Sequence, residues 1–475
     1  MYINGEWLQV TDSNSFWSTN PATGEPVAQV VDGDGAAATR AIDAAHGAFV
    51  SWSKTTAYDR AELLLRARDI VIERMADIAN LMSREQGKPL RAALNEVGYA
   101  ADFLRWYGEE ARRNYGKTIP SARPDQRFIT LQAPVGVVAA ITPWNYPVSM
   151  ITRKVAPALA AGCTVVLKPA EATPLCAVAM FEAMADAGIP KGVINLVTAR
   201  DPGPIGEVFV TDPRVNKITF TGSTATGRYL AAAAARSMKR ISLELGGHAP
   251  FIVLKDADPV HAAKGAGLVK FLNTGQACIS PNRMFVHQAL CEQFLQTLTD
   301  RSRRLIAGGG LVEGASIGPL VNQAAVEKVD RQVKNALENG ATLLCGGHRL
   351  TDNGLDKGHF YAPTVLTNIS PLMQIYREET FGPVAAVIPF SDSDDVYAMA
   401  NDTNYGLAAY VYTQSLSSAF EAMEKLRFGI IGINDINPTS AAAPFGGIND
   451  SGIGREGGAE GLQEYLETKT VGISI

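Results

Sequence analysis

The stretch FLNTGQACIS, residues 271–280, places one cysteine in a short polar turn after an apolar, helix-like run. Four roles are open to the thiol of Cys278: buried filler, metal ligand, half of a disulfide, or nucleophile. Free cysteines are often buried and then behave as small hydrophobes. A thiolate, in contrast, is a strong nucleophile toward carbonyl carbon. The other chemistry-bearing residues of the chain bear on this choice.

The cysteine and histidine pattern disfavours two of the four roles. The 5 cysteines are odd in number and contain no CxxC pair, which is typical of a reducing cytoplasm rather than of a disulfide framework. The 6 histidines show no HxxxH or HExxH spacing, so we expect no metal site. Filler and nucleophile remain open for Cys278.

Two other polar residues have surroundings that suit catalysis. In ITPWNYP, residues 141–147, Asn145 lies between two prolines, which hold a loop stiff and suit an amide that must point in one direction. In LELGGHAP, residues 243–250, Glu244 ends an apolar strand. A carboxylate with few polar neighbours would have a raised pKa, as a general base needs. The alternatives are a rigid turn with a packed tryptophan and a hydrogen-bonded structural carboxylate.

Two strand ends carry residues that suit a dinucleotide. In KITFTGSTATG, an apolar strand runs into Gly222 and Ser223, where small residues would let a helix N-terminus approach a phosphate. In CTVVLKPAEATP, Lys168 ends a strand and Glu171 follows in a loop. The acidic side chain would hold a ribose diol and disfavour a 2′-phosphate. A plain turn and a solvated Lys/Glu pair are the alternatives.

The elements that would position these residues alternate along most of the chain. The first third is mainly helical, with apolar residues at helical spacing over 36–52, 58–82 and 95–115. From residue 135 to 245, short β-rich runs alternate with helical stretches, which predicts a parallel sheet covered by helices. A second alternating series begins near residue 251 and predicts a second α/β domain.

Composition limits the class of protein. A chain of 475 residues with 46% hydrophobic and 19% charged residues is typical of two or three well-packed domains. A net charge of −5 and the lack of a Lys/Arg-rich run argue against nucleic acid and anionic membranes as partners. The N-terminus does not resemble a secretory signal, and the apolar runs are short. We therefore expect a cytoplasmic protein.

Six motifs, taken in order, resemble those of the aldehyde dehydrogenase superfamily over nearly the whole chain. They are PWNYP, the strand–GST–helix turn, ELGG, GQAC, EETFGPV and PFGG, and Cys278 follows Glu244 by 34 residues, as in the family. The resemblance implies an α/β aldehyde dehydrogenase-like fold that forms homodimers or homotetramers. Its parts would be a Rossmann-type NAD-binding domain (1–116 and 136–245), a catalytic domain (246–446) and a small β oligomerisation element (117–135 and 462–475).

The resemblance also implies a mechanism. Cys278 looks like the nucleophile that forms a thiohemiacetal and then a thioester, with the oxyanion held by the Asn145 amide and the Cys278 backbone N–H. Glu244 would activate the hydrolytic water. Family members that pass the acyl group to coenzyme A generally lack this glutamate, so hydrolysis is favoured. The cofactor-binding positions would be Trp144, Lys168, Glu171, Gly222, Ser223, Glu379 and Phe381. A glutamate at 171 favours NAD, with NADP possible.

Closer similarity is to the succinate-semialdehyde and 2-oxoglutarate-semialdehyde dehydrogenases, in FLRWYGEEARRNYGKTIP and MITRKVAPALAAGCTVVLKPAE. Arg153 follows Asn145 by eight residues, roughly two helical turns, and would bind an acidic tail, with a surface arginine as the alternative. Tyr146, Tyr107 and Thr439 would form pocket walls, with core packing as the alternative for both tyrosines. The expected substrate is succinate semialdehyde. The alternatives are 2-oxoglutarate semialdehyde, sulfolactaldehyde or a neutral aliphatic aldehyde.

Two positions depart from that group. The semialdehyde enzymes usually carry a second arginine six residues before the nucleophile, and Leu272 stands there. This change weakens carboxylate recognition or points to another acid group, such as a sulfonate. Some members also have a second cysteine two residues after the nucleophile, where this chain has Ser280, so we expect no redox-switching disulfide. A catalytically idle protein on the same fold is the rival, but it need not keep Cys278, Glu244 and Asn145.

Overall fold

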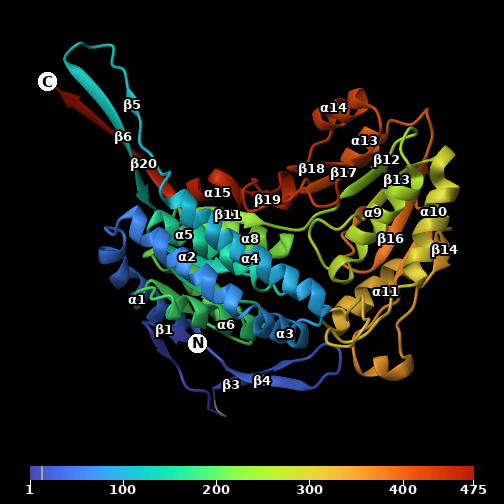
Figure 1. The fold of residues 1–475 in the computed structure, drawn as a ribbon, viewed down its shortest axis with the longest axis horizontal. Helices are drawn as coiled ribbons and strands as arrows, with labels where there is room; N and C mark the ends of the chain where they lie inside the picture. The colour runs from blue at the N-terminus through green and yellow to red at the C-terminus, as the bar shows by residue number, and fades with distance from the viewer. Residues whose placement is uncertain (12–13) are drawn as a thin grey trace.

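The computed structural model describes residues 1–11 and 14–475, which form two large sheets with their helices and a projecting arm (Figure 1). The first sheet has the strand order β19-β11-β10-β7-β8-β9-β1-β2. Its members are β1 (Tyr2–Ile3), β2 (Glu6–Trp7), β7 (Val137–Ile141), β8 (Thr164–Lys168), β9 (Ile194–Leu196), β10 (Val215–Thr221), β11 (Arg240–Glu244) and β19 (Gly452–Ile453). Strands β7 to β11 pair in parallel, which confirms the parallel sheet predicted over residues 135–245.

Helices cover both faces of this sheet because its central strands are apolar on both sides. Val137 and Ala139 of β7 pack in one core, whereas Val138 and Ala140 pack in another, as the alternation of side chains along a strand requires. The first face carries α1 (Gly35–Trp52), α7 (Gly203–Thr211) and α8 (Thr224–Ala235). The second carries α2 (Ala57–Glu73), α3 (Met75–Glu85), α4 (Leu90–Ala111), α5 (Ser149–Ala161) and α6 (Pro174–Asp186).

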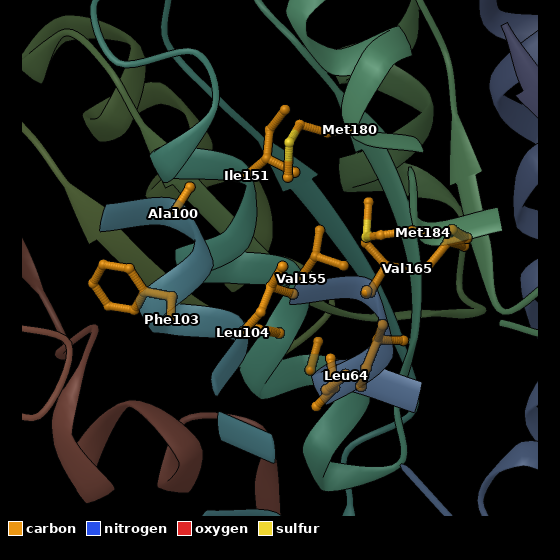
Figure 2. Close-up of a cluster of buried hydrophobic side chains, with 14 of the residues drawn as sticks. Leu64, Ala100, Phe103, Leu104, Ile151, Val155, Val165, Met180 and Met184 are labelled. Carbon is orange, nitrogen blue, oxygen red and sulfur yellow. The ribbon is translucent and has the colours of Figure 1, made fainter. Parts of the chain in front are cut away.

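Figure 2 shows the centre of the second core, where five elements meet. Leu104 of α4, Val155 of α5 and Val165 of β8 are at most 1% exposed. Close packing at this point joins helix α5 to the sheet, so the loop between β7 and α5 has both ends anchored. That loop contains the ITPWNYP motif.

The second sheet has the strand order β14-β15-β16-β13-β12-β17-β18. Its strands are β12 (Pro250–Val253), β13 (Arg283–His287), β14 (Thr342–Cys345), β15 (Thr364–Thr367), β16 (Val384–Phe390), β17 (Ala408–Tyr412) and β18 (Ile430–Ile433). All pair in parallel except β14. The helices of this region are α9 (Pro259–Phe271), α10 (Gln288–Arg303), α11 (Gln323–Glu338), α12 (Gln374–Arg377), α13 (Val396–Asn401) and α14 (Leu416–Lys425). The second α/β series predicted from residue 251 is confirmed.

The two sheets with their helices form two lobes, and a three-stranded arm projects from the lobe of the first sheet, with the C-terminus at one end of it (Figure 1). It consists of β5 (Thr118–Ile119), β6 (Gln126–Pro134) and β20 (Leu466–Ser474). Strand β20 pairs antiparallel with β6 along its whole length. The short helix α15 (Gly458–Gln463) precedes the arm and packs on α5. The division of the chain into three domains stays a prediction, although β11 and β12 fall in different sheets.

The first third of the chain is less uniformly helical than its periodicity predicts. Besides β1 and β2, it contains the two-stranded ribbon of β3 (Ser15–Thr19) and β4 (Pro26–Val31). These strands are short and depend on pairing with their neighbours, so local periodicity does not reveal them. No helix in the described part of the chain is long and apolar enough to span a membrane.

Candidate active site

The loop that carries Cys278 begins where α9 ends. Leu272 ends the helix, and Asn273 and Thr274 then adopt left-handed backbone angles, with φ of 48° and 60°. Such angles are uncommon for residues other than glycine, and asparagine tolerates them best. Gly275 has a positive φ and lies so close to the backbone of Gly382 that a Cβ would be 2.1 Å from its carbonyl oxygen. The chain therefore turns sharply and leaves Cys278 half-buried.

The thiol of Cys278 is protonated in this structure at neutral pH. Burial raises its pKa to about 12, and the negative charge of Glu244 adds to this rise, whereas Arg153 opposes it. Because only the thiolate attacks carbonyl carbon, the thiol needs a base or additional positive charge beside it. Its partial exposure leaves it within reach of a ligand, which a filler in a closed core would not be.

Asn145 is buried beside the same loop. It follows β7, and its Nδ2 donates a hydrogen bond of 3.1 Å to the carbonyl oxygen of Gln276. A carboxamide nitrogen has two hydrogens, so one N–H fixes the orientation of the amide and the other is left for a ligand. The structure therefore brings the predicted amide donor and the cysteine loop together.

Glu244 ends β11 and is 4% exposed. Within the described residues, neither of its carboxylate oxygens has a hydrogen-bond partner. Burial raises its pKa well above the usual value, and the charge of Glu456 raises it further, against the opposing effect of Arg153. The apolar strand predicted a carboxylate with few polar neighbours, and the structure has that arrangement. Such a group accepts a proton readily near neutral pH.

Arg153 lies in a buried charged cluster and is 2% exposed, so the surface alternative is wrong. Its Nε is 3.0 Å from Oε2 of Glu456, and its guanidinium is 3.9 Å from the ring centroid of Phe445. Lys154 forms an ion pair with the other oxygen of Glu456. The interpretation of its spacing also needs correction. Helix α5 begins at Ser149, so a short loop and about one helical turn, rather than two turns, separate Asn145 from Arg153.

Negative charge around Arg153 keeps the guanidinium fully ionised. Burial lowers its pKa, but the combined negative charge of its neighbours, with Glu456 contributing most, outweighs that effect, and the net pKa is raised. Glu244 contributes in the same direction. Among the described residues, Nη2 of Arg153 has no hydrogen-bond partner. A buried donor without a partner favours binding of an anionic ligand group.

The first sheet has a topological switch point between β7 and β10, because β7 leads to β8 on one side and β10 leads to β11 on the other. Ligands of doubly wound sheets bind in the crevice at such points. Thr142 directly follows β7, and Thr221 ends β10. Both hydroxyls are buried and have no hydrogen-bond partner in the described chain. Unpaired hydroxyls at the switch point fit a ligand with many hydrogen-bonding groups, as a dinucleotide has.

The other predicted cofactor residues lie around this crevice. Ser223 caps helix α8 and accepts a hydrogen bond from the Thr226 backbone N–H. At the end of β8, Lys168 Nζ is 3.2 Å from Glu171 Oε2, and Glu171 is exposed. Gly222 has a packing role, because a Cβ there would be 2.4 Å from the ring of Phe220; its approach to a phosphate stays a prediction.

Two cofactor candidates come from the second lobe. The rings of Trp144 and Phe381 meet edge to face with centroids 5.6 Å apart. Glu379 accepts a 2.9 Å hydrogen bond from the Gly247 backbone N–H, and burial raises its pKa. Residues of the two lobes therefore contact each other beside the switch point.

The predicted pocket residues and Ser280 make different kinds of contact. Tyr146 follows Asn145, and its ring lies 4.3 Å from Lys88 Nζ. Tyr107 is fully buried, which favours its core-packing alternative. Thr439 donates a 2.9 Å hydrogen bond to Asn437, and no contact in the described part of the chain joins it to Cys278. Ser280 is buried and donates to the Lys270 carbonyl.

Sequence reasoning missed the ionic neighbours of the site. Glu456 lies in a glycine-rich segment where a charged residue suggests a solvated loop, and Lys154 directly follows Arg153. Both are buried. Three further residues that contact Asn145 or its partners were also missed, namely Lys88, Asn273 and Gln276. Among residues 1–11 and 14–475, no group of three or more histidine, cysteine or acidic residues is placed to hold a metal ion.

A doubly wound sheet next to a thiol, an amide and an unpaired carboxylate is the arrangement expected of a dinucleotide-dependent oxidoreductase. The chain belongs to the aldehyde dehydrogenase family, whose model matches residues 7–471. The family resemblance and the α/β fold expected from the motifs are thereby confirmed.

Several characterised relatives are similar along the whole chain. The NADP(+)-dependent succinate-semialdehyde dehydrogenase of Escherichia coli is 46% identical, with 100% of this chain and 97% of that protein covered. The glutarate-semialdehyde dehydrogenase of Pseudomonas putida is 45% identical over 100% of this chain and 97% of its own length. The 3-sulfolactaldehyde dehydrogenase of Pseudomonas putida is 45% identical over 99% and 96%.

Solved structures agree with this assignment. The crystal structure of an NADP-dependent enzyme of E. coli has a TM-score of 0.97 and 45% identity, covering 100% of this chain and 98% of that one. Betaine aldehyde dehydrogenase from Staphylococcus aureus, in complex with NAD+, has a TM-score of 0.96 and 36% identity, covering 100% and 94%.

Proposed function

We propose that the protein is a semialdehyde dehydrogenase that oxidises a short, acidic-tailed aldehyde to the carboxylic acid through a thioester on Cys278. Succinate semialdehyde is the first candidate substrate. The observation that carries this proposal is the buried guanidinium of Arg153, whose Nη2 lacks a hydrogen-bond partner among the described residues and whose charge acts on Cys278 and Glu244.

The covalent step begins at the thiol. Cys278 gives its proton to water and its sulfur attacks the aldehyde carbon, so that a C–S bond forms and the carbonyl oxygen becomes an oxyanion. The free N–H of Asn145 Nδ2 and the backbone N–H of Cys278 donate to that oxygen. Preorganised donors of this kind stabilise the developing charge without reorganisation cost. Because the pKa of the free thiol is about 12, positive charge at the site is needed for this step.

The cofactor is a nicotinamide dinucleotide, NAD or NADP, which when bound would supply a hydride acceptor and, in its oxidised form, a positive charge. Thr142, Thr221 and Ser223 would bind it at the switch point. Glu379 would bind the nicotinamide ribose, with Trp144 and Phe381 beside it. The donor set consists of the unpaired hydroxyls of Thr142 and Thr221 and the N-terminus of α8, which Ser223 caps. It fits the phosphates and diols of such a molecule.

Glu244 completes the reaction. Its raised pKa lets it take a proton from water near neutral pH, and the resulting hydroxide attacks the thioester carbon. The C–S bond breaks, the carboxylic acid leaves, and Cys278 is regenerated. The nearby positive groups, Arg153 and Lys154, offset part of the cost of the buried carboxylate.

Arg153 would bind the acidic tail of the substrate. A guanidinium binds carboxylates with paired N–H donors, and part of its fork is engaged by Glu456. The unpaired Nη2 is the donor that a ligand would use. Leu272 supplies no second cation, so the substrate could be a longer or differently charged acid than succinate semialdehyde. Glutarate semialdehyde and 3-sulfolactaldehyde are second candidates, because similar relatives are named for them. 2-Oxoglutarate semialdehyde is a further candidate.

We propose NAD as the preferred cofactor, although a similar relative is named as NADP(+)-dependent. Glu171 is exposed at the end of β8 and pairs with Lys168. Its negative charge would accept a hydrogen bond from a ribose hydroxyl and repel a 2′-phosphate.

We also propose that the chain is a cytoplasmic homo-oligomer with the three domains expected from its sequence. All five cysteines are free, which suits a reducing compartment. The arm exposes Leu131, Val471 and Ile473, and β20 has one unpaired edge. Exposed apolar edges of this kind pair with other chains. Deletion of residues 467–475 should convert the oligomer to monomers in size-exclusion chromatography with light scattering.

The decisive experiment is a panel of aldehydes monitored by NADH or NADPH absorbance. It contains succinate semialdehyde, glutarate semialdehyde, 2-oxoglutarate semialdehyde, sulfolactaldehyde and propanal, each with NAD and with NADP. We expect the highest kcat/KM with an acidic aldehyde and NAD, and no turnover by Cys278→Ala. Equal kcat/KM for propanal and the acidic aldehydes would contradict the proposed substrate class. Unchanged turnover by Cys278→Ala would contradict the mechanism.

A further inference from the structure

The backbone carbonyl of Asn145 accepts two buried hydrogen bonds. Lys88 Nζ donates one of 2.8 Å, and Asn273 Nδ2 donates another of 2.9 Å. Lys88 comes from the turn between α3 and α4, and Asn273 comes from the loop of Cys278. The residue proposed to hold the oxyanion is therefore held at its own backbone from two directions.

Lys88 uses all of its capacity at this place. It forms a buried ion pair with Glu96 Oε2, donates to the Asn145 carbonyl, and lies 4.3 Å from the ring of Tyr146. An ammonium has three donors and no acceptor, so no hydrogen is left for another role. Both side chains of the ion pair are 1% exposed.

Glu96 links the same pair to the following helix. Its Oε1 accepts from the backbone N–H groups of Val148 and Ser149, at 2.9 and 3.2 Å. These are unpaired N–H groups at the start of α5, whose N-cap residue makes no side-chain cap. A carboxylate at a helix N-terminus is favourable. Glu96 therefore anchors the segment after Asn145, while Lys88 anchors Asn145 itself.

The cysteine loop closes the network. Asn273 Nδ2 also donates 3.2 Å to the Gln276 carbonyl, which is the oxygen that accepts from Asn145 Nδ2. Gln86, from the same turn as Lys88, donates 3.2 Å to Asn273 Oδ1. The backbone carbonyl and the side-chain amide of Asn145 are thus held by one hydrogen-bonded network. This network fixes the position of the side chain relative to the loop of Cys278.

We propose that Lys88 and Glu96, together with Asn273, are positioning residues that orient the Asn145 amide toward the oxyanion. A buried ion pair is weak evidence for stability, since apolar residues often replace one at no cost. Its function here is geometric, because a displacement of about 1 Å at a catalytic donor can lower a rate by about 100-fold. This inference rests on the oxyanion role of Asn145 in the proposed function.

The test is a double-mutant cycle. Lys88→Met/Glu96→Gln removes both charges together, and the glutamine can still accept from the α5 N–H groups. This variant is measured alone and in an Asn145→Ala background, with NAD and either succinate semialdehyde or propanal. In the protein that keeps Asn145, we expect this change to lower kcat and kcat/KM together by about tenfold or more, as loss of a transition-state interaction requires. In the Asn145→Ala background the same change should lower kcat by less than about twofold, because residues that act through one group are not additive.

A control is Lys217→Met/Glu464→Gln, which removes a Lys–Glu pair with a buried lysine and a half-buried glutamate, 3.3 Å apart, that makes no hydrogen bond to Asn145 in the described part of the chain. Its kcat should stay within about twofold of the wild type. Equal losses of kcat from the Lys88/Glu96 change in both backgrounds, or an equal loss in the control, would overturn the positioning role. If Asn145→Ala itself retains the wild-type kcat with both aldehydes, the oxyanion role fails instead, so the two failures are distinguishable.

A second variant covers the case in which the double substitution does not fold. Asn273→Gly removes the other donor to the Asn145 carbonyl, and glycine accepts the φ of 48° at this position. Its effect on kcat should likewise be lost in the Asn145→Ala background. Persistence of its full effect there would contradict the proposal on its own.

Discussion

Glu244 and Glu456 are both buried carboxylates, and their pKa values are displaced in opposite directions. Burial and the charge of Glu456 raise the pKa of Glu244. For Glu456, burial also raises the pKa, but Lys154 and Arg153 outweigh it and the net pKa is lowered. Where neighbouring groups are separated in this way, the one with the raised pKa is suited to accept a proton. Glu456 remains charged and fixes the cations, while Glu244 is free to act on water.

The pH dependence of turnover should report the raised pKa of Glu244. The base is inactive when protonated, so kcat should rise with pH through an apparent pKa above the usual 4.5 of a glutamate. Glu244→Gln should lower kcat by about 100-fold or more and remove that acidic limb. Rapid mixing should then show a burst of NADH followed by a slow steady state, because the thioester forms but is not hydrolysed. A variant that keeps the same acidic limb would assign it to another group.

Stability should depend on the same ionisation. A folded-state pKa above the unfolded value means that the stabilising contribution is present below pH 4.5 and is lost as pH rises through the folded pKa. Glutamine carries no charge to bury, so the Tm of Glu244→Gln should exceed that of the wild type at pH 8. The difference should shrink as pH falls toward 5 in calorimetric scans. A constant difference across that range would mean that the pKa of Glu244 is the same in the folded and the unfolded protein.

The tail-binding role of Arg153 separates acidic from neutral aldehydes. Arg153→Leu removes the unpaired Nη2 and should raise KM for succinate semialdehyde by about tenfold or more, as expected for loss of a charge-assisted contact. Propanal has no acidic tail, so its KM should change far less. Because the substitution also leaves Glu456 with Lys154 as its remaining partner, the Tm of the variant should be measured alongside. Equal effects on both aldehydes would remove Arg153 from this role.

The sequence carried more information about the fold than about the electrostatics of the site. The parallel strands from β7 to β11 were predictable because each is a short apolar run that alternates with a helical stretch. The ribbon of β3 and β4 was not, since a pair of edge strands is defined by its partner. The immediate neighbours of Cys278, Asn145 and Glu244 left their roles open, and the roles expected for them came from the resemblance of the six motifs to a family.

The ionic cluster could not be predicted because its members are far apart in the chain. Lys154 and Glu456 are 302 positions apart and become a buried pair when α15 packs against α5. A charged residue in a glycine-rich segment is usually solvated, so nothing local marks Glu456 as buried. For the same reason, Lys88 and Asn273 gave no local sign that they would share the carbonyl of Asn145.

Substrate choice can also be tested by adding a positive charge at position 272, where the chain has Leu272. It is 44% exposed at the end of α9, so an arginine can be placed there without disturbing a core. A cation at a helix C-terminus is also favourable. Leu272→Arg should lower KM for succinate semialdehyde by about two- to fivefold, within the range of a partly exposed ion pair, and leave KM for propanal unchanged. No change for any acidic aldehyde would mean that position 272 does not face the tail.

Cofactor preference should depend on the charge at position 171. Glu171 has a side chain that is 50% exposed and pairs with Lys168, which is 5% exposed. Glu171→Ser removes the carboxylate that would repel a 2′-phosphate and leaves Lys168 free to contact it. We expect the ratio of kcat/KM for NADP to that for NAD to rise by about tenfold or more, with little change in Tm because the position is exposed. Glu171→Gln is the matched control, since it keeps the size and removes the charge, and it should produce a large part of the same shift. If the two variants retain the wild-type ratio, the discrimination between NAD and NADP lies elsewhere in the crevice.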